Sequence, residues 1–255
     1  MPRPRLHSLD DLLDVAEQLV TSGDPAGLTL RSLATSSGAS NGTIYHAFHS
    51  KEELLARLWL RATSRLGTIM EEGIQSVDQT APGSTAAQEA VVALAVAPVV
   101  FTRRHRASAQ LFFAQRSDQL FSADLAPDVV ASLEGERKRF VGMLLALAAG
   151  VWDRKDRFAV EAIAVCVVDI PGGILRRALI EGREIDDETV RRIEAAVRAV
   201  LAVPLTPLSE PHYLSPTVRA QSADRLPLGA AQRRAACDGV AIKMNLNRVA
   251  GSEAP

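Results

Sequence analysis

A short run of polar side chains between residues 41 and 51 has the types and spacing needed to bind a nucleic-acid backbone. Asn41, Thr43, Tyr45 and Lys51 offer amide, hydroxyl and ammonium donors, which are the groups that contact phosphates and base edges. Thr43 and Tyr45 fall on a predicted short helix that Ser40 caps. A helix with short polar residues at its N-terminal end fits the major groove of B-DNA.

The distribution of charge around this run favours the same chemistry. Residues 1–66 contain seven basic and seven acidic residues, so this part of the chain has no overall basic excess. However, no Asp or Glu occurs from Pro25 to Lys51, where Arg31 and Lys51 are the cations. The first nine residues also lack acids and carry Arg3 and Arg5, which could reach DNA as a flexible arm. A surface without carboxylates does not repel phosphates.

Two other motifs in the same region suggest different chemistry. Residues 38–42 match G-x-S-x-G, the nucleophile elbow of hydrolases, but that elbow needs a buried strand before its serine, and here a helical pattern precedes Ser40. His46 and His49 could be metal ligands, yet no His/Glu partner motif or Cys cluster accompanies them. The sequence therefore predicts no catalytic residue, no metal and no cofactor, and an enzyme that uses Ser40 is the weakest hypothesis.

The elements that must position these side chains are three short helices and a long one. Ser8 with Asp11 forms a capping-box pattern at the start of the first helix, which Gly23-Asp24-Pro25 ends. A second helix over about 29–36 and a third through His46 are joined by a turn at Gly38, which is the helix-turn-helix arrangement. A small core should form beneath them from Leu12, Ala16, Leu19, Leu33, Ile44, Phe48 and Leu54.

The rest of the chain is predicted to form further helices, and it shows neither the alternating apolar–polar pattern of β-strands nor internal repeats. After a long helix over 50–78 and a linker at 81–84, helical patterns cover 84–103, 105–116, 126–150, 155–181 and 186–202. In the last of these we expect Asp187–Arg191 and Glu188–Arg192 pairs. From Val203 onward the pattern changes: residues 203–255 contain six of the thirteen prolines and no sustained periodicity, which predicts a mostly disordered tail.

Composition excludes several classes of protein. The net charge of −1, from 29 basic and 30 acidic residues, excludes a uniformly basic nucleic-acid coat. Two cysteines cannot supply a disulfide framework, which favours reduced thiols in a cytosolic protein. The longest apolar run, 90–101, is shorter than the roughly 20 residues of a bilayer span and predicts a buried helix. No signal peptide is visible.

Three segments in succession resemble the DNA-binding domain of the TetR family of transcriptional regulators. They are residues 28–34 (LTLRSLA), 38–45 (GASNGTIY) and 48–55 (FHSKEELL). The similarity covers about residues 8–60 and is specific in residues and in spacing, whereas the rest of the chain resembles the family only in its helical layout. The resemblance implies an all-α fold. It also implies three parts: a helix-turn-helix DNA-binding domain at 1–60, a helical ligand-binding and dimerisation domain at 61–202, and the tail at 203–255.

The resemblance implies roles for individual residues of the helix-turn-helix. Thr43, Tyr45 and Lys51 occupy positions where the family contacts phosphate. A second set occupies positions where family members read bases or follow the floor of the groove: Arg31, Asn41, Gly42 and His46. Arg31 could pair with guanine and Asn41 with adenine. Tyr45 as a packing residue and His46 as a solvated histidine are the alternatives.

The C-terminal half of the chain implies a partner and a ligand. In the family, two helices such as 155–181 and 186–202 form the homodimer, whose two-fold symmetry would match a pseudo-palindromic operator. The alternative is that these helices pack only within one chain. Helices 84–103, 105–116 and 126–150 could enclose an unknown small molecule, and Pro98 and Pro171-Gly172-Gly173 could mark kinks beside its cavity. The candidate lining residues, which could equally be plain core, are Phe101, Phe112, Phe140, Met143, Trp152 and Cys166.

The leading hypothesis is a cytosolic, dimeric, ligand-responsive repressor. The alternative is an architectural or non-specific DNA-binding protein without a ligand. Arginines at residues 103, 104 and 106 could hold an anionic group of such a ligand, although a solvated helix end is the simpler interpretation of this cluster.

Overall fold

The computed structural model describes residues 8–22, 27–77, 83–114 and 125–205, and within these ranges the fold is all-helical, as the sequence predicts. In chain order the helices are α1 (Leu9–Ser22), α2 (Leu30–Ser37), α3 (Asn41–Ala47), α4 (Lys51–Gln75), α5 (Gly83–Arg104), α6 (Arg106–Ala114), α8 (Pro127–Trp152), α9 (Arg157–Ala164), the π-helical turn η2 (Val165–Asp169), α10 (Ile170–Ile180) and α11 (Asp187–Leu201). The predicted arm at Arg3 and Arg5 and the predicted tail from residue 206 lie outside the described residues.

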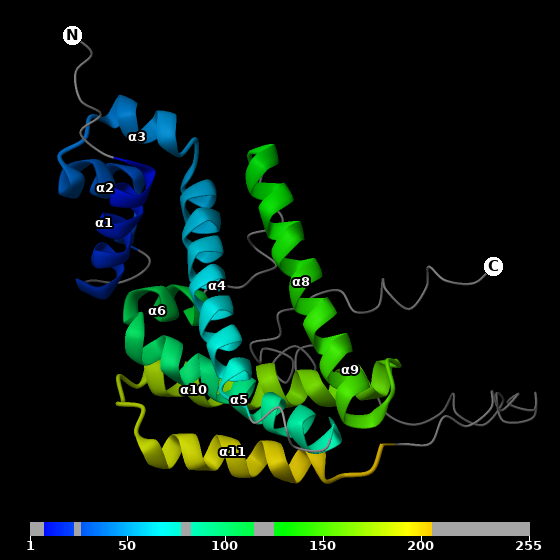
Figure 1. The fold of residues 1–255 in the computed structure, drawn as a ribbon. Helices are drawn as coiled ribbons and strands as arrows, with labels where there is room; N and C mark the ends of the chain where they lie inside the picture. Colours follow the sequence, from blue (N-terminus) through cyan, green and yellow to red (C-terminus); the bar gives the residue numbers. More distant parts are fainter. Residues whose placement is uncertain (1–7, 23–26, 78–82, 115–124, 206–255) are drawn as a thin grey trace, which may run out of the picture.

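Helices α1, α2 and α3 form a separate unit at one end of the molecule, which we call the head (Figure 1). Its core contains the predicted residues: Ile44, Phe48, Leu33 and Ala16 are completely buried. Ser8 and Asp11 make the two reciprocal hydrogen bonds of a capping box at the start of α1. Local caps and a small apolar core therefore fix the geometry of the head.

Helix α4 leaves the head and runs into a larger helical unit, which we call the body (Figure 1). Leu54 and Leu58 near its start belong to the core of the head, whereas Leu66 and Ile69 farther along belong to the core of the body. The same helix thus contributes to both cores, so the orientation of the head depends on how α4 packs against α5, α6 and α8.

The body packs α5 against α4, α8 and α11, with α10 and α11 at the end far from the head (Figure 1). Two helical stretches, Ser84–Arg104 and Arg157–Ile180, are long and apolar enough to cross a membrane. In the most apolar window of each stretch, 50% and 44% of the residues are buried inside the fold. Core helices of a soluble protein have the same length and composition, and α5 has the central position that such a helix needs.

Several local predictions differ from the structure. Helix α4 ends at Gln75, three residues before its predicted end, and α5 begins at Gly83, one residue before its predicted start. Helix α5 continues through Pro98, and the predicted helix over 155–181 contains the π turn η2 directly before Pro171. The backbone is therefore irregular just before the predicted Pro-Gly-Gly interruption, because proline lacks the amide donor that a regular helix needs.

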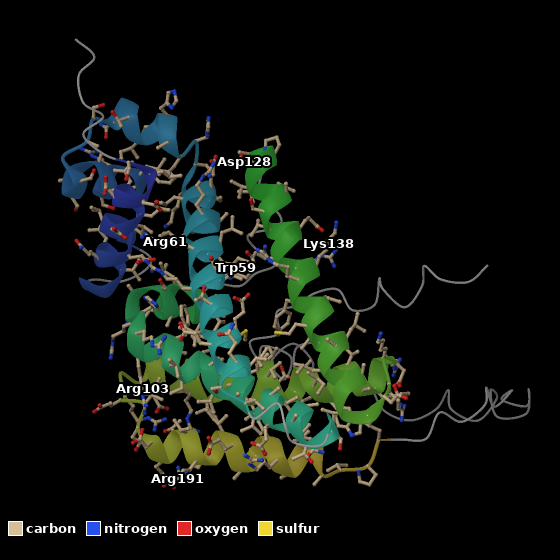
Figure 2. The ribbon with its side chains drawn as sticks, viewed as in Figure 1. Trp59, Arg61, Arg103, Asp128, Lys138 and Arg191 are labelled. Carbon is tan, nitrogen blue, oxygen red and sulfur yellow. The ribbon has the colours of Figure 1, made fainter. Side chains whose placement is uncertain are left out.

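Charged pairs at the end of the body also differ in part from the prediction. Glu188 pairs with Arg192, as expected, but it also binds Arg191, the predicted partner of Asp187. Asp187 instead accepts a hydrogen bond of 2.9 Å from Arg103, which also donates to the backbone carbonyl of Ile185. A long-range partner replaces the local pair because the 103–106 cluster lies at the junction of α5 and α11. Arg103 and Arg191 are labelled there in Figure 2.

Candidate DNA-binding surface

The turn between α2 and α3 is held by one glycine and one cap. Gly38 adopts the left-handed conformation, with φ of 69°, and so ends α2. Ser40 begins α3: its Oγ accepts a hydrogen bond of 3.1 Å from the backbone N–H of Thr43 and lies 2.9 Å from the hydroxyl of Thr43. These contacts fix the direction in which α3 leaves the turn, and with it the direction of its exposed side chains.

Helix α3 has one buried side and one exposed side. Ile44 is completely buried, whereas Tyr45 leaves 56% of its surface exposed. All of the predicted base-reading or groove-following residues are exposed, and Thr43 is exposed with them: Arg31, Asn41, Gly42 and His46. The structure thus exposes these side chains on α2 and α3, and we call the surface that they contribute to the recognition face.

Lys51 lies at the edge of the recognition face, in the first turn of α4. Ser50 caps this helix, because its Oγ accepts a hydrogen bond of 3.0 Å from the backbone N–H of Glu53. Lys51 is partly buried. The ammonium group and the N-terminal end of α4 both add positive charge at this edge, which suits contact with a phosphate.

Two carboxylates follow Lys51 in the first turn of α4: Glu52 is exposed, whereas Glu53 is turned inward. Glu53 is 2% exposed; its Oε1 accepts hydrogen bonds from Arg57 at 3.0 and 2.8 Å, and its Oε2 lies 3.1 Å from Nδ1 of His49. Arg57 also donates to Asp128 of α8 at 3.1 Å (Figure 2). This contact between head and body was not among the sequence predictions. The spacing of four residues within α4 could have indicated Glu53–Arg57, but no local pattern indicates Asp128.

The residues proposed for a ligand pocket belong to the core of the body or pack against it. Phe101, Phe112 and Cys166 are buried, with 0%, 7% and 0% of their surface exposed. The rings of Phe101 and Phe112 pack edge to face, with centroids 6.1 Å apart. Burial raises the pKa of the Cys166 thiol to about 12, so this thiol is protonated at neutral pH. A second group is only partly buried and packs against the same core: Phe140, Met143 and Trp152.

The structure gives little support to a nucleophile elbow at Ser40, a metal site or an anion-binding arginine cluster. Ser40 follows a helix rather than a strand and acts as a helix cap, so it lacks the setting of a nucleophile elbow. Among the described residues, no group of three or more His, Cys, Asp or Glu side chains could hold a metal ion. The 103–106 cluster is engaged within the protein, since Arg103 pairs with Asp187 and Arg104 pairs with Glu72 at 2.7 Å.

Comparison with known sequences supports the interpretation of the head. The family model "Bacterial regulatory proteins, tetR family" matches residues 12–58. Two uncharacterised HTH-type transcriptional regulators of Mycobacterium tuberculosis, from strains CDC 1551 and H37Rv, are each 41% identical over 58 residues. That match covers 23% of this chain and 29% of each relative, so it concerns a small part of both.

Solved structures extend the similarity of fold to the body. A TetR-family transcriptional regulator from Thermus thermophilus, PfmR, is 18% identical, with a TM-score of 0.51, and the match covers 78% of this chain and 97% of PfmR. A transcriptional regulator from Rhodococcus sp. RHA1 is also 18% identical, with a TM-score of 0.55 and coverage of 78% and 100%. At these identities the likeness concerns the fold, and it includes head and body together.

Proposed function

We propose that this chain, whose residues 12–58 match the tetR family model, regulates transcription as a homodimeric repressor. In this proposal it is a soluble cytoplasmic protein, binds a pseudo-palindromic DNA operator and is released by a small-molecule ligand. The observation that carries the proposal is the recognition face, on which exposed polar and basic side chains project from α2 and α3 in a stretch of 27 residues, 25–51, without a carboxylate.

The residues of the recognition face are proposed to have two different roles, phosphate contact and base reading. Thr43, Tyr45 and Lys51 are proposed to bind phosphates, because hydroxyl and ammonium donors suit oxyanions, and Thr43 and Lys51 lie in the first turns of α3 and α4. Base reading is assigned to the other exposed positions of this face: Arg31, Asn41, Gly42 and His46. Gly42 contributes by leaving space, since an added Cβ there would meet only the hydroxyl of Ser40, at 3.7 Å.

The second copy is proposed to cover the outer side of α9, η2 and α10. Phe158 and Ile180 are large apolar residues with 40% and 75% of their surface exposed, and Val165 between them is partly exposed and does not pack against the core of the body. Phe158, Val165 and Ile180 are apolar positions along this stretch, and the exposed carboxylates Glu161 and Asp169 lie one turn on either side of Val165. Solvent contact with such apolar positions is unfavourable, and the same positions on a second chain can cover them symmetrically.

The dimer is tested by placing a charge among these apolar positions. Val165→Arg should convert the dimer to monomer, because a long charged side chain would replace a partly exposed apolar one in the middle of the proposed interface. Val130→Arg on α8 is the matched control, since Val130 is 45% exposed and lies on a different helix. Analytical ultracentrifugation reads the mass. A dimer that persists in Val165→Arg, or a wild-type monomer, would contradict this interface.

The ligand is proposed to act through α5, α6 and α8, which contact α4 below the head. A molecule bound among the partly buried residues Phe140, Met143 and Trp152 would displace these helices and change the distance between the two recognition faces. Each tenfold loss of operator affinity needs about 1.4 kcal/mol of differential ligand affinity between the two states.

Selection of bound duplexes from a random DNA pool tests the whole proposal. The expected result is a palindromic sequence with two half-sites, which indicates both specificity and two-fold symmetry. Equal affinity for all duplexes at physiological salt would instead favour an architectural DNA-binding protein and refute the regulator. A specific but non-palindromic sequence would refute the dimeric mode of binding.

A further inference from the structure

A polar cluster of two buried residues and one partly exposed arginine joins the head to the body where α1, α4 and α6 meet. Nη1 of Arg65 on α4 donates to both carboxylate oxygens of Glu17 on α1, at 2.8 and 2.9 Å, and to Oγ of Ser108 on α6, at 2.5 Å. The hydroxyl of Ser108 donates in turn to Oε1 of Glu17 at 2.8 Å. Ser108 is 1% exposed and Glu17 is 8% exposed. We call these three residues the α1–α4–α6 cluster.

Two neighbouring contacts strengthen the same junction. Leu111, one helical turn beyond Ser108 on α6, is 2% exposed and belongs to the apolar core of the head rather than to that of the body. Arg61, one turn before Arg65 on α4, pairs with Asp14 on α1 at 2.5 Å (Figure 2). Helix α6, which otherwise belongs to the body, is therefore in direct contact with α1 as well as with α4.

The polar cluster restricts motion in a way that apolar packing alone does not. Apolar side chains tolerate a small slide, because their attraction has little directional preference. Glu17, in contrast, is a buried carboxylate whose oxygens are bound by Arg65 and Ser108 from two different helices. A shift of α6 against α1 would lengthen these bonds and leave a desolvated charge without its partners, which is strongly unfavourable.

We propose that Glu17, Arg65 and Ser108 are positioning residues that fix the angle of the head on the body and so determine which half-site spacing the dimer accepts. The inference rests on the proposed function, because spacing matters only to a dimer that reads two half-sites. One base pair of added spacing moves a half-site by about 3.4 Å and rotates it around the duplex. A head that the cluster holds at a fixed angle cannot move with the displaced half-site. A head that lacks these hydrogen bonds can change its angle and still reach it.

The experiment measures operator affinity of the full chain for a series of duplexes, made from the selected operator, whose half-site spacing differs by one or two base pairs. The wild type should prefer one spacing. Ser108→Ala removes the hydroxyl but leaves the Arg65–Glu17 pair, and it should reduce that preference about twofold to tenfold. Affinity for an isolated half-site and its salt dependence should stay unchanged, because the recognition face is untouched.

Two further variants separate positioning from general stability. Glu17→Gln keeps the shape of the side chain but removes its charge, so it should reduce the spacing preference further. Thr102→Val is the control, since Thr102 is 6% exposed and its hydroxyl donates to the carbonyl of Pro98 within α5 rather than to a residue of the cluster. If all three variants lower the melting temperature while the spacing preference stays at the wild-type value, the proposed positioning role is refuted.

A second readout needs neither DNA nor a dimer. Spin labels at the exposed positions Ser36 on the head and Ala199 on α11, in a Cys166→Ala, Cys237→Ser chain, report the head-to-body distance. Labelled chain is diluted with excess unlabelled chain, so that only distances within one protomer are measured. Ser108→Ala should broaden the distance distribution and Thr102→Val should not. An unchanged width in Ser108→Ala overturns the inference.

The two readouts also distinguish the inference from the proposed function. If the wild type has no spacing preference, the proposal of a dimer on a two-half-site operator fails, and the distance distribution alone decides whether the cluster holds the head. If the wild type prefers one spacing and Ser108→Ala keeps both that preference and a narrow distribution, the proposed function stands and the positioning role is wrong.

Discussion

Removal of the Tyr45 hydroxyl should weaken operator binding without affecting folding. The ring is 56% exposed, and an exposed substitution of this kind changes the free energy of unfolding by less than about 0.5 kcal/mol. A hydrogen bond from a hydroxyl to a phosphate is worth about 1.5 kcal/mol or more. Tyr45→Phe removes one such bond from each head of the dimer, or about 3 kcal/mol in all, which corresponds to a loss of roughly a hundredfold in affinity.

The salt dependence of binding distinguishes this loss from the loss of a cation. Tyr45→Phe removes no charge, so the slope of log K against log salt should remain that of the wild type. Lys51→Ala removes one phosphate-binding cation per head, and it should reduce the slope by about 1.8 for the dimer, which is two times 0.9. Fluorescence anisotropy titrations at several salt concentrations measure both quantities, and thermal unfolding verifies that the variants fold.

Two outcomes would refute the assignment of these residues to phosphate. Wild-type affinity in Tyr45→Phe would show that the ring does not donate to DNA. An unchanged salt slope in Lys51→Ala would show that the ammonium group releases no counterion on binding. A change in base preference, rather than a uniform loss across sequences, would instead assign Tyr45 to base reading.

Two further predictions concern stability and are measured by thermal unfolding. Asp153 ends α8 in the left-handed conformation, with φ of 52°, so Asp153→Gly should stabilise the fold by about 1 kcal/mol, whereas Asp153→Ala keeps the Cβ and should give no gain. Partial desolvation and the nearby Glu161 carboxylate raise the pKa of Asp169, so the fold loses stability as the pH rises from the ordinary pKa of an aspartate through the raised one. Asp169→Asn should therefore be more stable than the wild type at neutral pH, and this advantage should vanish below about pH 4; a constant difference across pH would contradict it.

The head could be predicted in detail because its determinants are local. The Ser8–Asp11 capping box, the turn at Gly38 and the cap at Ser40 each involve residues at most four positions apart, and each forms as the sequence predicts. The same locality explains why the exposed and buried sides of α3 agree with prediction. A helix of known start and length has its faces fixed by the helical period.

The contacts between head and body could not be predicted, because their partners are far apart in sequence. Ser108 and Glu17 are separated by 91 residues, and Arg57 and Asp128 by 71. No periodic pattern indicates which of many serines and carboxylates will meet at a helix junction. The Asp187–Arg191 pair failed for the same reason, since Arg103 is 84 positions from Asp187 and is one of its partners in the folded chain.

The net charge of the whole chain says little about DNA binding, because it does not show where the charged residues lie. The total of −1 combines the stretch 25–51, which contains no carboxylate, with acids elsewhere in the chain, of which some are exposed and some are buried. Glu53 is turned inward and bound by Arg57, and Glu17 is buried against Arg65. These carboxylates neutralise arginines at the junction of head and body rather than repelling phosphates. A protein with a net charge near zero can therefore still have a surface suited to DNA, because carboxylates such as Glu17 and Glu53 pair with arginines inside the fold.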